Sequence, residues 1–387
     1  MRILGTTNEY AARVGHINDL ARNVGSGAVI HLDPNTAWTF GPPGKNMIDL
    51  RSTPLNGAVV DVKRLTIIGH GATVAIDLQS IMAGVDLTLE DLTLACRGDP
   101  ELRPGAQATG FVAIERADGA RSGGSLTCRN VNITTETAIN ALTNIKYLVQ
   151  LDTKDGAEGE DIKLSVVNGS FLHLYHSAEP ANASSSRMLG IASGSLSVSG
   201  TLELGRSTDQ ATTEPSFQIN EGISPQILSK TGKIVVNAGM LVSGEFDLPL
   251  VIDQLHINTQ SYMTPAIAIR MGDVIAENPP ETRNLRLRIN HLTLARSPGA
   301  AANTQVAIKP VATVDNNLFE TLADANTVDD IVGEDGYSMP RNNTIFIGRH
   351  TQVGFGPDLA QSANLYPALV AATTPGIVTD TEINVRI

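Results

Sequence analysis

Carboxylates placed close together are the first residues in this sequence that could carry chemistry. Glu90 and Asp91 are adjacent, and Asp253 occupies a similar polar break between two short apolar segments. Two carboxyl groups on one face can act as general acid and nucleophile, or acid and base, in cleavage of a glycosidic bond. Glu90, Asp91 and Asp253 are therefore the candidate catalytic residues. The competing interpretation is that they are structural polar residues at bends of the chain.

A second group of acids is confined to one short segment. Five acids and two glycines lie between residues 152 and 161. Calcium prefers flexible loops rich in oxygen ligands. The candidate metal ligands are Asp152, Asp155, Glu158 and Asp161. Their spacing differs from an EF-hand loop, and Lys154 brings a positive charge into the segment, so a solvated loop without metal is favoured.

Other residue types that support catalysis or cofactor binding are dispersed. The eight histidines form no spaced motif, and the sequence contains neither a Gly-x-Ser-x-Gly nucleophile elbow nor a phosphate-binding loop. The glycine-rich segment 68–72 is predicted to be a tight bend after a strand. Cys96 and Cys128 lie in predicted strands, where free cysteines are usually buried. We therefore expect no cofactor, no zinc site and no disulfide framework.

Composition limits the classes of function. The formal net charge of −12 argues against a nucleic-acid partner, because phosphate binding requires a basic surface. No apolar segment reaches the ~18 residues of a membrane-spanning helix, and the N-terminal residues lack the apolar region of a secretory signal. Aromatic residues are only 4% of the chain, with Trp38 as the single tryptophan. Because polysaccharide grooves usually offer several aromatic rings, this composition disfavours sugar cleavage.

The N-terminal segment has the pattern of a helix followed by a strand. Residues 9–24 are predicted to be helical, with an N-cap from residues 6–8 and an end at Gly25. The apolar side chains of this helix recur on one face: Val14, Ile17, Leu20 and Ala21. Alternation over Ala28–Leu32 then predicts a strand, and Asp33-Pro-Asn35 predicts a turn.

A pattern of four apolar residues, at positions i, i+2, i+5 and i+7, recurs along the chain. Its copies begin at Leu87, Leu126, Leu164, Ile234, Leu250 and Leu287, with weaker copies at Leu65, Leu196 and Ile345. Alternation in each half predicts a short strand with one buried face, and the slip between the halves predicts a sharp corner. The unequal intervals between copies predict loops of different length between coils.

Mostly polar residues occupy the two positions between the halves of each copy. They are Glu90-Asp91, Arg129-Asn130, Val167-Asn168, Asn237-Ala238, Asp253-Gln254 and Asn290-His291. Stacked asparagines are a structural feature, which favours a structural role for these corners. An antiparallel sandwich or barrel also contains short alternating strands. The bent pattern and the scarcity of Asn-Gly and Asp-Gly hairpin turns favour a solenoid instead.

The order of helix, glycine-rich break, short strand and repeated bent strands resembles the right-handed parallel β-helix proteins of the pectate-lyase-like type, bacteriophage tailspike and virion-surface proteins among them. The resemblance implies an all-β solenoid in which a short N-terminal helix covers the open end of the first coil. We accordingly expect a cap with a helix in residues 1–26 and a β-helix body in residues 27–300. Residues 301–387 would form a distinct β-rich region for oligomerisation or particle attachment.

The expected function is that of a non-catalytic structural protein of a bacteriophage virion, either decorating the capsid or forming a spike or fibre. The resemblance implies a homotrimer on the virion surface that contacts capsid or tail proteins. It would be made in the host cytoplasm without a signal peptide and without membrane insertion. The cap starts almost at Met1, which departs from tailspikes with a separate N-terminal particle-binding domain and favours capsid decoration or an adaptor.

Two alternatives stay open. The first is a depolymerase of the tail spike type that cleaves polysaccharide as a hydrolase or a lyase. The second is an adhesin that binds host surface polysaccharide without cleaving it, and so serves host attachment.

Overall fold

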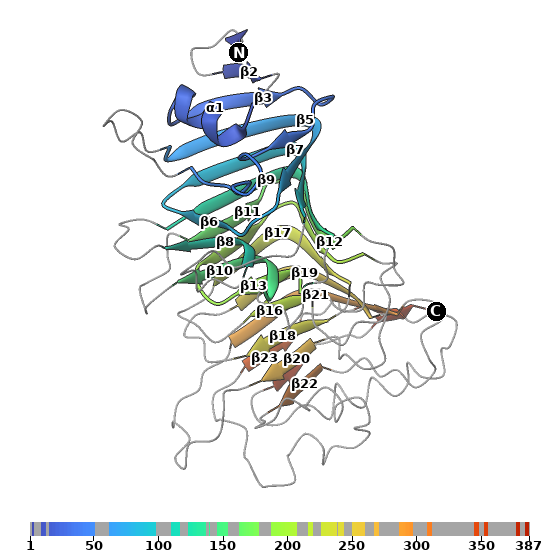
Figure 1. Cartoon of the computed structure of the whole chain (residues 1–387). Helices are drawn as coiled ribbons and strands as arrows, with labels where there is room; N and C mark the ends of the chain where they lie inside the picture. The colour runs from blue at the N-terminus through green and yellow to red at the C-terminus, as the bar shows by residue number, and fades with distance from the viewer. Residues whose placement is uncertain are drawn as a thin grey trace, which may run out of the picture.

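The computed structural model shows a mostly parallel all-β chain with a single α-helix among the residues it describes (Figure 1). These residues are 2–3, 9–12, 15–50, 62–97, 110–116, 123–136, 139, 145–153, 162–177, 187–206, 216–219, 226–237, 239–243, 250–259, 267–270, 286–296, 308–311, 344–347, 352–354, 377–379 and 384–386. No helix within them is long and apolar enough to cross a membrane. The parallel all-β class expected from the sequence is confirmed.

The first sheet contains long strands with a corner near their middle. Elsewhere in this sheet, two short strands take the place of the two halves of such a long strand. The long strands are β5 (Arg64–Ile76), β7 (Asp86–Cys96), β9 (Ser125–Thr135), β17 (Gln226–Val236), β19 (Leu250–Thr259) and β21 (Arg286–Arg296). The pairs are β3 (Ala28–Leu32) with β4 (Trp38–Thr39), β11 (Lys163–Val166) with β12 (Phe171–His176), β14 (Ser195–Val198) with β15 (Thr201–Leu204), β23 (Thr344–Ile347) with β24 (Gln352–Gly354), and β25 (Ile377–Thr379) with β26 (Asn384–Arg386). Both halves pair in parallel with their neighbours; β9, for example, pairs with β11 in one half and with β12 in the other.

The second sheet is built from shorter parallel strands that lie in sequence order. They are β6 (Ser80–Ala83), β8 (Gly110–Arg116), β10 (Tyr147–Thr153), β13 (Leu189–Ile191), β16 (Phe217–Ile219), β18 (Met240–Ser243), β20 (Ile267–Arg270) and β22 (Ile308–Val311). From β6 to β22 the chain visits the two sheets in turn and adds to each sheet at every visit. Figure 1 shows the strands following one another down the molecule in this order.

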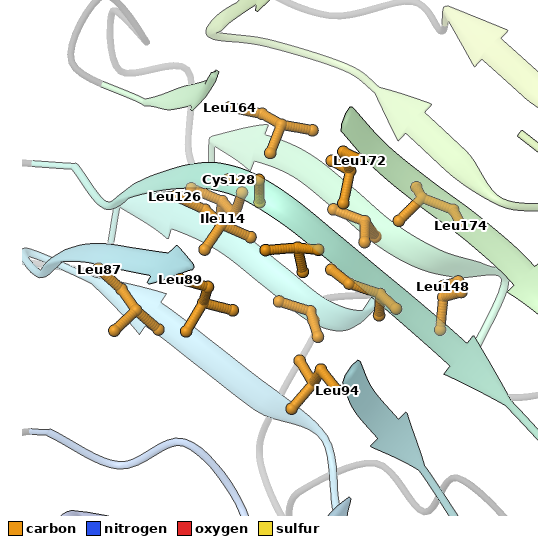
Figure 2. Packing of buried hydrophobic residues seen from close by; sticks show 14 of the residues in the cluster. Leu87, Leu89, Leu94, Ile114, Leu126, Cys128, Leu148, Leu164, Leu172 and Leu174 are labelled. Atoms are coloured by element: carbon orange, nitrogen blue, oxygen red, sulfur yellow. The ribbon is translucent and has the colours of Figure 1, made fainter. Parts of the chain in front are cut away.

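Apolar side chains of equivalent positions stack on neighbouring strands and form the core. In the first half of the first sheet, the register places five buried leucines side by side: Leu65, Leu87, Leu126, Leu164 and Leu196. The second half stacks Val74, Leu94, Ile133, Leu174 and Leu204 in the same way. The second sheet contributes Val112, Val149, Leu189, Phe217 and Met240. Figure 2 shows leucines of the first sheet in one cluster with Ile114 and Leu148 of the second.

The two cysteines belong to this core. Cys96 and Cys128 are free and buried, as expected from the sequence. Burial raises the pKa of both thiols above the usual range, because a thiolate would lose its hydration inside the apolar core. Both side chains therefore act as small apolar groups and not as nucleophiles.

The N-terminal helix is shorter than the pattern predicted. Helix α1 spans Ile17–Val24, and Glu9–Ala12 forms strand β2 instead, so the predicted start of the helix was wrong. Strand β2 pairs in parallel with β3 and antiparallel with β1 (Arg2–Ile3), and Gly15 has a φ of 129° that interrupts any continuous helix. The pairing supplies backbone hydrogen bonds from a strand distant in sequence, which outweigh a weak local helix preference. The proposed N-cap residues lie outside the described residues.

The other local features at this end agree with the sequence. Gly25 ends the helix with a φ of 84° and donates its N–H to the Ala21 carbonyl. The strand at Ala28–Leu32 has the predicted bounds, and the Asp33 carboxylate accepts a hydrogen bond from the Asn35 N–H in the predicted turn. Ile17 and Ala21 are buried in the core cluster, and Leu20 packs against it.

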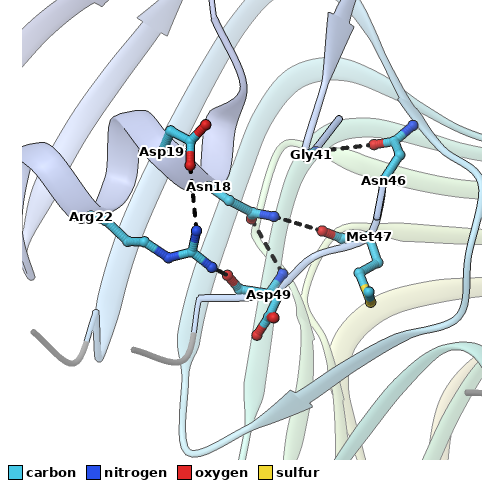
Figure 3. A network of polar contacts seen from close by, with 7 residues as sticks. All are labelled: Asn18, Asp19, Arg22, Gly41, Asn46, Met47 and Asp49. Atoms are coloured by element: carbon cyan, nitrogen blue, oxygen red, sulfur yellow. Dashed lines mark hydrogen bonds and ion pairs between the residues drawn. The ribbon is translucent and has the colours of Figure 1, made fainter. Parts of the chain in front are cut away.

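A polar network attaches the helix to the segment that follows β4 (Figure 3). The Asn18 side chain donates to the Met47 carbonyl at 2.8 Å and accepts from the Asp49 N–H at 3.2 Å. Arg22 donates to the Asp49 carbonyl at 3.0 Å. These bonds satisfy backbone groups of an irregular segment, which would otherwise be costly next to the core.

Most copies of the apolar pattern lie where they were predicted, but two do not. In the copy at Leu164, the corner is longer, so Leu172 and Leu174 point inward and Gly169 and Phe171 are exposed. The copy at Ile234 does not span a corner of the first sheet, because its second half belongs to β18 of the second sheet. In both cases the spacing of apolar residues alone could not distinguish one kind of bend from another.

The described strands after residue 300 join the same sheets. Strand β22 pairs with β20, and β23 and β24 pair with the two halves of β21. Strands β25 and β26 pair in turn with β23 and β24. A separate role of residues 301–387 in oligomerisation or attachment stays a prediction.

Truncating one stacked leucine tests the importance of the core. Leu126 is 1% exposed and lies between Leu87 and Leu164. We expect Leu126→Ala to lower the free energy of unfolding by about 2–5 kcal/mol, through lost burial and a residual cavity. Thr127→Ala is the matched control on the same strand, with an expected loss under about 1 kcal/mol. Urea denaturation measures both, and equal losses would contradict this packing.

Candidate functional site

The corners of the first sheet contain residues in the left-handed backbone conformation. His70, Asp91 and Asn130 have φ values of 52°, 51° and 54°. Asp and Asn tolerate this region better than most residues because their short polar side chains can bond locally. Gly169 takes the same role at the longer corner between β11 and β12, with a φ of 72°. Polar residues thus recur at the corners because the backbone conformation there favours them.

The candidate catalytic acids at this corner are engaged with the next strand. Glu90 and Arg129 form an ion pair of 3.3 Å, and the Asn130 amide donates to Asp91 at 3.0 Å. At the start of the same two strands, the Ser125 hydroxyl donates to Asp86 at 2.5 Å. Glu90 is 28% exposed and Arg129 is 49% exposed, so the ion pair is screened by water and weak. These contacts give the carboxylates a structural use between β7 and β9.

The structure does not bring Asp253 to Glu90 and Asp91. Asp253 lies at the corner of β19, and successive pairings through β9, β11, β14 and β17 separate β19 from β7. At ~4.8 Å per strand, this path is roughly 24 Å long. The two carboxyl groups of a glycosidase are about 5–9.5 Å apart. Asp253 therefore cannot be the partner of Glu90 in such a reaction.

The acidic segment is described only at its start. Asp152 accepts a hydrogen bond of 3.2 Å from the Gln150 amide, whereas Asp155, Glu158 and Asp161 lie outside the described residues. Within the part of the chain that the structure describes, no group of three or more His, Cys, Asp or Glu residues is arranged to hold a metal ion. The proposed calcium ligands stay a prediction.

An aromatic patch that the sequence analysis missed lies on the outward face of β12. We define the aromatic patch as Phe171, His173, Tyr175 and Arg206. Phe171 is 40% exposed, and the rings of His173 and Tyr175 are 4.3 Å apart between centroids. The Arg206 guanidinium lies 4.4 Å from the Tyr175 ring centroid. Such a cation–π contact orients both groups at the surface.

The strand explains how these side chains come together. Leu172, Leu174 and His176 point inward, so residues 171, 173 and 175 share the outer face. His173 is held by a 2.9 Å hydrogen bond to the Gly205 carbonyl at the end of β15. The alternation of aromatic residues in this segment was the available signal, but the pattern had assigned Phe171 to the core. Trp38, by contrast, is buried and donates to the Asp33 carbonyl.

Two histidines also meet on the outer surface of the first sheet. His31 of β3 and His70 at the corner of β5 approach to 2.9 Å between Nδ1 and Nε2. They are far apart in the sequence, and the spacing of histidines gave no indication of this pair. The register of β3 against β5 brings them together.

Comparison of the chain with protein-family models, with curated proteins and with solved structures finds no match.

Backbone conformation at the corner can be tested at Asn130. Both Asn130→Gly and Asn130→Val remove the hydrogen bond to Asp91, so their difference reports the backbone alone. We expect the valine variant to be less stable than the glycine variant by about 1–2 kcal/mol, because a left-handed conformation is costly for a β-branched residue. Chemical denaturation compares the two proteins. Equal stability would contradict the assigned corner geometry.

Proposed function

We propose that the chain is a right-handed parallel β-helix that serves as a non-catalytic structural protein on the surface of a bacteriophage virion. The path of the chain supports the solenoid: it alternates between two parallel sheets, one of which has a corner, and adds a strand to each sheet at every visit. Such a coil presents three strand faces around one core. The resemblance of the sequence pattern to virion-surface β-helix proteins is the ground for placing the protein on a particle.

The single observation that carries the structural role is the use of the corner carboxylates. Glu90 forms an ion pair with Arg129 of the adjacent strand, and Asp91 accepts a hydrogen bond from Asn130. Asp253 lies too far from both acids to act as their catalytic partner. Carboxylates that are already paired with side chains of the adjacent strand need no substrate to explain their presence. In this proposal the function of the chain is to present a stiff, extended surface, and the homotrimer and its contacts with capsid or tail proteins follow from the family resemblance.

Two measurements on the purified protein test this proposal. Mass photometry at micromolar concentration is expected to give three chains of 40.9 kDa per particle. Incubation with a panel of capsular and extracellular polysaccharides is expected to release no new reducing ends or unsaturated products. A stable monomer would contradict the proposed assembly. Sugar release that is lost in Glu90→Gln, Asp91→Asn or Asp253→Asn would contradict the non-catalytic role and favour a depolymerase.

Binding of a host surface polysaccharide is the second candidate function, and the aromatic patch favours it. A flat ring such as Phe171 can cover the apolar face of a sugar, while Arg206 and His173 offer hydrogen-bond donors at the margin. Among the side chains that the structure describes, Phe171 is the large apolar one that is exposed. The patch lies on a regular strand, which keeps its spacing fixed. Binding there would make the particle protein an adhesin.

A glycan array separates this second candidate from a purely structural role. If the patch binds sugar, Phe171→Ala and Tyr175→Ala should each weaken binding about tenfold, or about 1.4 kcal/mol. Thr201→Ala is the matched control, because Thr201 is the β15 neighbour of Phe171 in the register but carries no ring. Equal binding by all three variants would exclude the aromatic patch as the site.

A further inference from the structure

The histidine pair on the outer surface is joined through the edges of its rings. His31 Nδ1 and His70 Nε2 are 2.9 Å apart, a hydrogen-bond distance. The ring centroids are 5.2 Å apart and the ring planes differ by 16°. Because the two nitrogens are much closer than the centroids, the rings meet edge to edge and not face to face. The two nitrogens therefore point at a common position between them.

Only one hydrogen can occupy that position. One imidazole donates its N–H and the other accepts with its lone pair. The second nitrogen of His31, Nε2, is buried and has no hydrogen-bond partner in the structure. Whichever tautomer His31 adopts, a buried nitrogen stays unsatisfied, which costs free energy.

We propose that His31 and His70 form a binding site for a divalent transition-metal ion of the zinc or copper class. His31 Nδ1 and His70 Nε2 are the protein ligands, and water completes the coordination. Neutral imidazole is a preferred ligand of these ions. The site is independent of the proposed virion role, because it requires only the register of β3 against β5.

The distance between His31 Nδ1 and His70 Nε2 is close to the distance between two nitrogen ligands of a zinc ion. Zinc binds imidazole nitrogen at ~2.0–2.1 Å, so two nitrogens of a tetrahedral site lie roughly 3.3 Å apart. The present separation of 2.9 Å must therefore open by a few tenths of an ångström. The rings must also turn so that both lone pairs point at an ion beside the line that joins the nitrogens. His70 can supply most of this movement, since it is exposed and lies between Gly69 and Gly71 at the corner. The ring that donated the shared hydrogen carries it on its other nitrogen once the metal is bound.

The character of the site follows from its small number of ligands. No group of three or more potential metal ligands occurs among the described residues, so the remaining positions belong to water. Structural zinc sites use four protein ligands, whereas exchangeable and catalytic sites keep positions open. We therefore expect an exchangeable ion at this site, with a readily reversible effect of chelators.

Titration calorimetry with zinc chloride tests the site on the full chain without an affinity tag. Wild-type protein should bind one equivalent of zinc. Loss of an outer-sphere partner alone weakens metal sites by about 10–100-fold, so loss of a ligand in His31→Gln or His70→Gln should weaken binding at least about tenfold. His256→Gln on β19, several strands away, is the matched control and should bind as wild type.

Two further results decide the proposal. His70→Glu keeps a zinc ligand of similar reach at the corner and should retain binding, which distinguishes lost ligation from lost folding in the glutamine variant. Far-UV circular dichroism confirms that each variant is folded. The proposal is overturned if wild-type protein binds no zinc, or if folded His31→Gln and His70→Gln proteins bind it as tightly as wild type.

Discussion

Stacking of apolar side chains at equivalent positions of neighbouring parallel strands is the constraint on which the rest of this structure depends. A parallel strand cannot pair with the segment next to it in sequence, so each strand relies on strands from earlier and later segments of the chain. Leu87, Leu126 and Leu164 show the result: three leucines from separate segments share one buried row. Burial of each such side chain contributes about 1.5–3 kcal/mol, and the backbone ladder satisfies the polar groups between them.

The corners determine which side chains become neighbours on the outer surface. A left-handed residue at Asp91 or Asn130 turns the strand so that both halves keep their apolar side chains inside. Residues at the same corner of adjacent strands then become neighbours on the outside. This explains why Glu90 meets Arg129 and why His70 reaches His31 on the adjacent strand. The same geometry that makes carboxylates structural in one place brings two imidazoles together in another.

The outer surface carries two separate groups of side chains on one support. The aromatic patch depends on the alternation of β12, and the histidine pair depends on the register between β3 and β5. Neither requires a change in the core, because the outward positions of a strand are free to vary while the inward ones are occupied. The segments that connect the described strands differ in length in the sequence, while the stacked rows of the core keep their register.

The sequence by itself determined four features of this chain. They are the short alternating strands, the polar corners, the burial of both cysteines and the end of the helix at Gly25. These features follow from side-chain periodicity and backbone preferences within a few residues. Tertiary structure alone decided the start of α1, the outward position of Phe171 and the meeting of His31 with His70. Segments of unequal length separate the strands in the sequence, so neighbouring strands of a sheet have no constant spacing. Only hydrogen-bond register and core packing between distant segments select which side chains finally meet.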